Sequence, residues 1–149
     1  MPTFPASDIL VPVDLSEPSM QALDHATSLA RSTSGIHVLT ILPELSAMEP
    51  GISWGSIDDE TRIATMEDAL RAKLAERDID DARVHVVVAR GNPGWQIAKE
   101  ATNLDVDLVV IASHGRTGWQ RLAMGSVAER VVRFSPCPVL VVRQTRASR

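Results

Sequence analysis

Short apolar runs alternate with segments of helical periodicity along the whole chain. The runs are rich in Val, Ile and Leu and are bounded by polar or turn-forming residues, which is typical of buried strands. They lie at Asp8–Val13, His37–Leu42, Arg83–Val88, Val106–Ala112 and Pro138–Arg143. Because the runs are apolar at nearly every position, we expect strands of a parallel sheet whose two faces are both covered by helices.

Between these runs, apolar residues recur at the three- and four-residue spacing of an amphipathic helix. The predicted helices begin near Glu17, before Ile63, at Asn92-Pro93-Gly94 and near Ser126. Ser16 is the expected N-cap of the first helix, Pro18 lies in its first turn, and Gly35 is expected to end it. A polar segment rich in Gly and Pro, residues 43–56, precedes the second helix and is long enough to suggest a functional loop.

The order strand, helix, strand, repeated to the end of the chain, requires crossover connections. It predicts one doubly wound α/β domain over residues 1–149 with a five-stranded parallel sheet. In such a sheet, ligands bind beyond the carboxyl ends of the strands, where the strand order reverses. Two strand ends carry suitable residues: Pro12-Val13-Asp14-Leu15-Ser16 follows the first strand, and Ala112-Ser113-His114-Gly115 follows the fourth.

Composition narrows the class of protein. The 149 residues are 44% hydrophobic and 23% charged, as in an ordinary globular domain. One cysteine cannot make a disulfide framework or a cysteine-built zinc site, and His25, His37 and His85 lack metal-ligand spacing. No apolar run approaches the roughly 20 residues of a membrane helix, and the first residues do not resemble a signal peptide. We therefore expect a soluble, cytoplasmic protein with no membrane partner.

The net charge of −4 argues against a general nucleic-acid-binding surface. The charge is unevenly distributed. Residues 1–112 carry 8 basic and 18 acidic side chains, whereas residues 113–149 carry 7 basic side chains and 1 acidic side chain. Two interpretations remain open. The chain ends in a basic tail containing Arg143, Arg146 and Arg149, or its C-terminal third meets an anionic ligand.

The segment after the fourth predicted strand has the features of an anion site. Gly115 lacks a side chain that would block a close approach. Gly125-Ser126 stands directly before a helix, where unpaired amides and the positive end of the helix dipole attract anions, and Arg116 adds positive charge. The alternative is structural, because Ser126-Val127-Ala128-Glu129 fits a capping box that would satisfy the same amides without a ligand.

Asp14 and His114 each have a functional and a structural interpretation. Asp14 could contact a ligand or only cap the entry to the first helix. His114 could contact a phosphate or a ribose, or it could simply be solvated. The common nucleotide fingerprints GxxxxGK[ST] and GxGxxG after the first strand are absent, as is the GxSxG elbow of many hydrolases.

These residues together give the chain a family resemblance: it resembles the universal stress proteins, and in particular their ATP-binding subclass. The first feature is Pro12-Val13-Asp14 with Ser16, and the second is Gly115 followed, after nine residues, by Gly125-Ser126. The third is Ser126–Val131 followed by Ser135–Val142. The resemblance covers residues 8–143. It implies a Rossmann-like sheet of order 3-2-1-4-5, similar to the adenine nucleotide alpha hydrolases, with a nucleotide across its carboxyl edge.

The resemblance also implies which residues hold the nucleotide. Asp14 would meet the ribose, the backbone of Val13 and Ile41 would frame the adenine, and the glycine motif would hold the phosphates. The implied site consists of Pro12, Val13, Asp14, Ile41, Ile111, Ala112, His114, Gly115, Arg116, Gly125, Ser126 and Val127. The expected cofactor is ATP, with or without Mg²⁺. The family's motif usually begins with glycine where this chain has Ala112, whose methyl group could crowd the ribose.

The leading hypothesis from this resemblance is a cytoplasmic ATP-binding regulatory protein of the stress response. It would form a homodimer through Val139–Val142, act on a regulatory partner and hydrolyse ATP slowly at most, because no carboxylate lies in residues 115–126. One alternative is a stress-linked dimerisation module that binds no nucleotide. The other is an enzyme such as a nucleotidyl transferase or ATP pyrophosphatase, although the HxGH and SGGxDS patterns that those classes resemble are absent.

Overall fold

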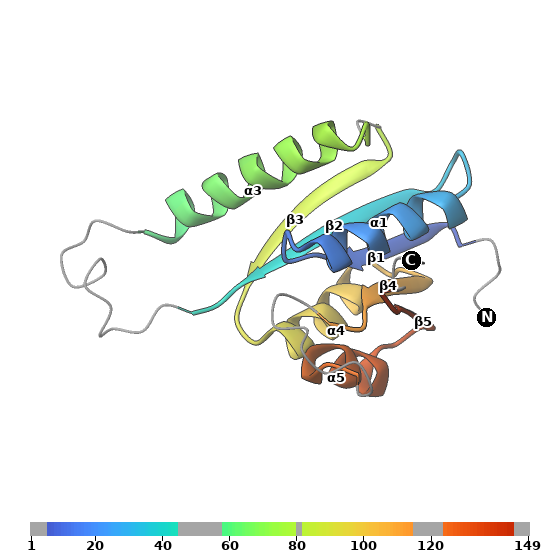
Figure 1. Ribbon diagram of the computed structural model, residues 1–149. Coiled ribbons are helices and arrows are strands. Elements are labelled where there is room, and N and C mark those ends of the chain that lie inside the picture. The colour runs from blue at the N-terminus through green and yellow to red at the C-terminus, as the bar shows by residue number, and fades with distance from the viewer. Residues whose placement is uncertain (1–5, 45–57, 80–81, 115–123, 145–149) are drawn as a thin grey trace, which may run out of the picture.

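Five parallel strands form one sheet in the order β3-β2-β1-β4-β5 (Figure 1). The computed structural model describes residues 6–44, 58–79, 82–114 and 124–144. The strands are β1 (Asp8–Pro12), β2 (Gly35–Leu42), β3 (Val84–Arg90), β4 (Leu108–Ala112) and β5 (Val139–Val142). The strand order therefore reverses between β1 and β4. Both the α/β class and the order 3-2-1-4-5 are confirmed.

Four helices lie in the described part of the chain and cover the two faces of the sheet. They are α1 (Glu17–Leu29), α3 (Asp59–Glu76), α4 (Pro93–Asn103) and α5 (Ser126–Phe134). Figure 1 shows α1 and α3 on one side of the sheet and α4 and α5 on the other. Among the described residues, no helix combines the length and the apolarity needed to cross a bilayer.

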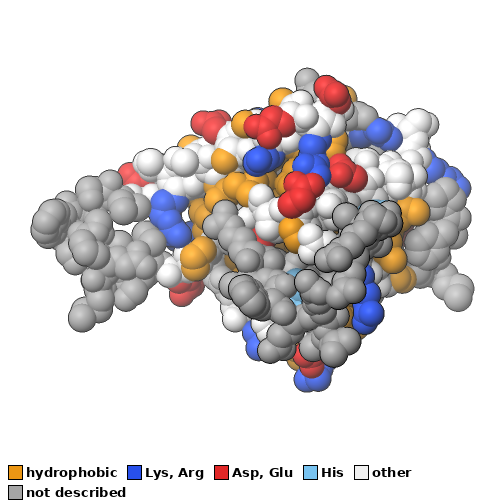
Figure 2. All heavy atoms as spheres, in the orientation of Figure 1, with side chains coloured by type: hydrophobic (Ala, Val, Ile, Leu, Met, Phe, Trp, Pro, Cys, Tyr) orange, Lys and Arg blue, Asp and Glu red, His pale blue; other side chains and the backbone are white. Residues whose placement is uncertain are grey.

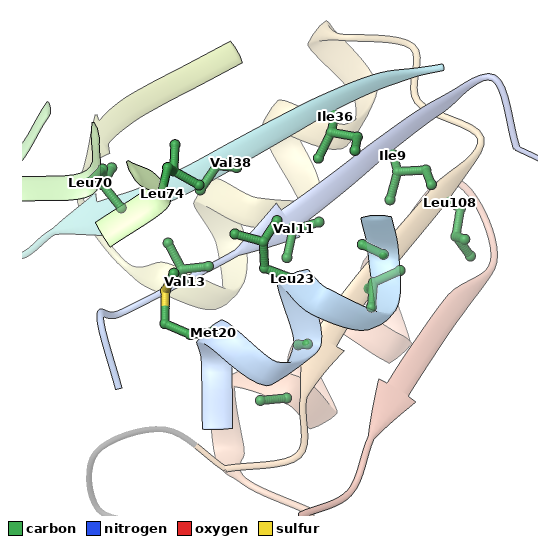
Figure 3. Close-up of a cluster of buried hydrophobic side chains, with 14 of the residues drawn as sticks. Ile9, Val11, Val13, Met20, Leu23, Ile36, Val38, Leu70, Leu74 and Leu108 are labelled. Carbon is green, nitrogen blue, oxygen red and sulfur yellow. The ribbon is translucent and has the colours of Figure 1, made fainter. Parts of the chain in front are cut away.

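Each face of the sheet has its own hydrophobic core, because side chains alternate between the two faces along a strand. On the first face, one cluster joins Val11 and Val38 of the sheet to Met20 and Leu23 of α1 and to Leu70 and Leu74 of α3 (Figure 3). On the second face, the cluster joins Leu10, Leu39, Ile97, Ala128 and Val131. Full burial of one such large side chain is worth about 1.5–3 kcal/mol.

The ends of α1 show one predicted boundary that is right and one that is wrong. Ser16 is the N-cap, and its side chain accepts a hydrogen bond from the Ser19 amide. Gly35 does not end the helix, because α1 stops at Leu29 and Gly35 is the first residue of β2. A Cβ at Gly35 would collide with the Asp8 carboxylate. This glycine therefore leaves room for the Asp8 side chain in its observed position.

An ion-pair network joins α1 to the end of α3. The Arg77 guanidinium lies 2.8 Å from a carboxylate oxygen of Glu17 and 3.2 Å from one of Asp24. The hydrogen bond from Arg77 is the main cause that lowers the pKa of Glu17. Figure 2 shows acidic and basic side chains intermixed over the surface that α1 and α3 form. The segment predicted as a loop, residues 43–56, lies outside the described residues after Glu44.

Candidate functional site

A pocket of about 320 Å³ lies at the carboxyl ends of β1, β2 and β4, beside the first turns of α4 and α5. This is where the strand order reverses, the usual ligand position in an open parallel sheet. Its volume is at the lower end of the roughly 300–1,000 Å³ of small-molecule sites. The topology therefore forms a cavity at the predicted edge of the sheet.

The pocket brings together ten of the twelve residues predicted for the site. They are Pro12, Val13, Asp14, Ile41, Ile111, Ala112, His114, Gly125, Ser126 and Val127. The other two, Gly115 and Arg116, lie outside the described residues. The sequence reasoning missed Ser19, Leu39, Pro93, Ile97, Ser113 and Ala128, which also line the pocket. The start of α4 at Pro93 was visible in the sequence, but its position beside this edge depends on the crossover connection.

The β2 side of the pocket combines apolar side chains with backbone groups that point toward β1. Gly35 N donates to Ser7 O, and Leu39 O accepts from Val13 N at 2.8 Å, so odd-numbered residues of β2 turn their backbone groups toward β1. By the alternation of strand backbone, the amide and carbonyl of Ile41 face the same way. They lie two residues beyond the Val13–Leu39 bond, at the edge of the pocket.

The turn after β1 holds Asp14 at the pocket. Asp14 N donates to Ser19 Oγ at 3.2 Å, and Asp14 Oδ1 accepts from Ser16 N at 3.0 Å and from the Ser16 hydroxyl. Leu15 has a φ of 64°, a left-handed conformation that costs a bulky residue about 1–3 kcal/mol. The N-cap of α1 is Ser16, so Asp14 braces the helix entry through Ser16 while also lining the pocket.

The helix α5 begins without the predicted capping box. Gly125 is its N-cap, Ser126 is its first helical residue, and no side chain of the described residues caps it. The other helices that the structure describes have side-chain caps from Ser16, Asp58 and Asn92. The capping-box interpretation is wrong because Ser126 lies one position too late. The amides of the first turn are thus left to partners other than a capping side chain.

Gly125 fixes the start of α5 against the end of β4. Its amide donates to Ser113 O at 2.8 Å, and Ser113 N donates to Val142 O of β5 at 2.9 Å. A Cβ on Gly125 would lie 2.9 Å from Ser113 O and 3.5 Å from Nδ1 of His114. A glycine is therefore required here by the close approach of two backbone segments.

The methyl group of Ala112 belongs to the α1-side core. Ala112 lines the pocket but is only 9% exposed and forms part of the cluster that contains Val11 and Met20. Strand alternation gives it the same direction as Val110 of that cluster. The methyl group that the sequence suggested could crowd a ribose is therefore packed with the core cluster.

Few charged groups line the pocket in the part of the chain that the structure describes. Asp14 and His114 are the lining side chains there that can carry a charge. No group of three or more His, Cys, Asp or Glu side chains suited to a metal ion occurs among the described residues. The pocket combines an apolar wall with backbone groups and the first turns of α4 and α5.

Comparisons with known proteins agree on one family. The chain matches the model of the universal stress protein family over residues 6–143. It is 30% identical over 142 residues to universal stress protein MJ0531 of Methanocaldococcus jannaschii, covering 93% of this chain and 82% of that protein. The structure of universal stress protein UspA from Lactobacillus plantarum superposes with a TM-score of 0.74 at 26% identity, over 92% and 97% of the two chains. A universal stress protein in complex with cAMP shares the fold, with a TM-score of 0.61 at 20% identity, over 92% and 97%.

Proposed function

The chain belongs to the universal stress protein family, and from this premise we propose that it binds ATP at the carboxyl edge of its sheet. In this proposal it is a dimeric regulatory protein of the stress response in the cytoplasm. A regulatory partner distinguishes the loaded from the empty pocket. ATP supplies a phosphoanhydride bond, and the residues around the pocket favour binding of the triphosphate over hydrolysis of that bond.

The uncapped start of α5 carries this proposal. Ser126, Val127 and Ala128 of the first turn line the pocket, and no side chain among the described residues caps this turn. Gly125 keeps a Cβ out of the space beside His114. Backbone N–H groups at the positive end of a helix suit the oxygens of a phosphate. The residues therefore fit a phosphate group, which the amides of residues 126–128 would hold.

The opposite wall supports a purine as the apolar part of the ligand. Leu39, Ile41 and Ile97 give an apolar surface there, and the Ile41 amide and carbonyl border it. The N–H donor and the C=O acceptor of the Ile41 backbone match adenine, whose polar edge has a ring-nitrogen acceptor and an amino-group donor. Asp14 follows β1, which lies between β2 and β4 in the sheet, and is the proposed partner of the ribose.

The experiment that tests the proposal compares two substitutions at Ser126. Isothermal titration of the unaltered chain with ATP, with and without Mg²⁺, should show saturable binding. Ser126→Ala should bind ATP nearly as well, because the amide and not the hydroxyl is the proposed donor. Ser126→Asp should lose about tenfold or more in affinity through charge repulsion, while its melting temperature is kept or raised by an acid in the first turn.

Two results would contradict ATP binding at this helix start. The first is the absence of binding heat in the unaltered chain, together with no nucleotide in the extract of the purified protein. The second is equal ATP affinity in Ser126→Asp and Ser126→Ala. Because a structural neighbour is in complex with cAMP, titrations with cAMP and AMP belong in the same series to define the nucleotide.

The edge strand β5 supports the proposed dimer. The sheet order leaves one side of β5 unpaired within the described residues, and Leu140 is 40% exposed there. Val109 N donates to Pro138 O and Ser113 N donates to Val142 O, so the even-numbered residues face β4. Val139 and Val141 therefore turn their backbone groups outward, where a second copy could pair antiparallel across a two-fold axis.

A further inference from the structure

Arg130 packs against Gly94, the neighbour of the pocket residue Pro93, and was not included in the site prediction. It follows Ser126 by four residues in α5, so both residues lie on the same face of the helix. Side chains of a helix tilt toward its N-terminus, and an extended arginine spans about one helical turn of 5.4 Å. The side chain therefore points toward the N-terminal end of α5, and its guanidinium bonds to Asn92 at the start of α4.

The aliphatic stem of Arg130 is fixed against the start of α4. A Cβ at Gly94 would lie between 2.5 and 2.9 Å from Cβ, Cγ and Cδ of Arg130, so the buried glycine leaves room for the stem. The neighbouring residue Pro93 lines the pocket. Arg130 therefore crosses from α5 to α4 at the rim of the cavity.

The charge of Arg130 has no acidic partner in the described part of the chain. Its Nη1 donates to the neutral Asn92 Oδ1 at 3.0 Å, which also caps α4 through Trp95 N. The next arginine of the helix, Arg133, instead lies 3.6 Å from Glu129. A guanidinium has five donor hydrogens and suits planar binding of phosphate oxygens. Here the guanidinium bonds to the N-cap residue of α4, at the positive end of that helix, an arrangement that an anion would stabilise.

We infer that Arg130 binds the terminal phosphates of the nucleotide and makes the pocket select a nucleoside triphosphate over a monophosphate. The inference rests on the proposed function. The pocket walls and the amides of residues 126–128 would bind the base, the sugar and the first phosphates of any adenine nucleotide. Arg130 adds a charge that only a longer phosphate chain reaches.

The test measures ATP and AMP affinity by titration calorimetry in four forms of the full chain. Arg130→Gln keeps part of the stem and should weaken ATP binding about 10- to 100-fold, the range for a lost charged hydrogen bond, while AMP affinity stays unchanged. Arg130→Lys should recover part of the ATP affinity because it keeps the charge. Arg133→Gln, in the same helix but paired with Glu129, should bind both nucleotides as the unaltered chain does. Melting curves establish that each form is folded.

The possible outcomes separate this inference from the proposed function. If the unaltered chain binds no ATP, the proposed function fails and this inference fails with it. If it binds ATP and Arg130→Gln binds ATP equally well, only the role of Arg130 is overturned. An equal loss of ATP and AMP affinity in Arg130→Gln would also overturn it, because it would indicate a structural role at the junction of α4 and α5.

Discussion

A methyl group has opposite consequences at two positions that border the same pocket. At Ala112 it joins the hydrophobic cluster that contains Val11 and Met20. At Gly125 it would press on the Ser113 carbonyl at 2.9 Å. The conformation and the surroundings of each residue, rather than its nearness to the pocket, decide which side chain the site tolerates.

Ala112→Gly should therefore change stability and leave ATP affinity unaltered. The free energy of unfolding should fall by about 1 kcal/mol, because glycine adds backbone freedom in the unfolded chain and removes a buried methyl group. Urea unfolding and ATP titration measure the two effects. Ala89→Gly, in β3 and away from the pocket, is the matched control for a strand alanine. A marked loss of ATP affinity in Ala112→Gly alone would show that the ribose lies elsewhere.

The N-cap position of α5 could not be predicted from the sequence of that segment alone. The letters Ser126-Val127-Ala128-Glu129 fit a capping box, but the helix begins one residue earlier than that motif requires. The cause is not local. Gly125 N bonds to Ser113 O of the preceding strand end, and this contact sets the first helical residue. A one-residue shift in the helix start decides whether the amides are capped or available, and only the tertiary contact determines it.

At the scale of elements, the strands could be predicted because covered faces leave near-continuous apolar runs. Their ends could not, because pairing partners set them. The strand β2 begins at Gly35 rather than at His37, since Gly35 N donates to Ser7 O beside β1. The strand β4 begins at Leu108 and not at Val106, whose amide bonds back to Ala101 O at the end of α4. Hydrophobic pattern predicts the type of an element, and neighbours in space determine its bounds.

The free side of β5 leads to a test of the proposed dimer. Proline in place of Val141 removes an N–H that faces away from β4, so the bonds to β4 should survive while pairing with a second copy is lost. We expect light scattering to give a dimer for the unaltered chain and a monomer of nearly unchanged circular dichroism for Val141→Pro. Leu140→Pro is the control, because its N–H faces β4 and its loss should destabilise the fold.

A monomeric unaltered chain at micromolar concentration would contradict the dimer. A Val141→Pro form that stays dimeric would place the contact outside β5. Leu140 alone is a weaker argument, because single exposed apolar side chains are common on monomers. The stronger argument is the backbone of β5, whose outer side has no partner strand among the described residues.

At the scale of the whole molecule, the topology explains why most of the candidate site could be predicted. The ends of β1, β2 and β4 and the start of α5 meet at the reversal of the strand order, so residues chosen at those points lie around one cavity. Pro93 and Ile97 were missed because they belong to α4. The position of that helix over the sheet depends on packing against β2 and α5, which no motif in the sequence records.

The same arrangement predicts that bound ATP is hydrolysed slowly and therefore stays bound and intact for a long time. Binding needs amides, a glycine and an apolar wall, whereas fast hydrolysis needs a group within about 2.6–3.2 Å of the attacking water to accept its proton. Of the described lining residues, Asp14 accepts hydrogen bonds from Ser16, which leaves His114 as the candidate base. The rate of single-turnover hydrolysis should therefore be well below the enzyme median of about 10 per second.

His114→Ala should change the hydrolysis rate little, and His25→Ala on the exposed face of α1 is the control for preparation effects. A rate near that median, lost in His114→Ala and kept in His25→Ala, would instead make His114 a catalytic base and the protein an ATPase.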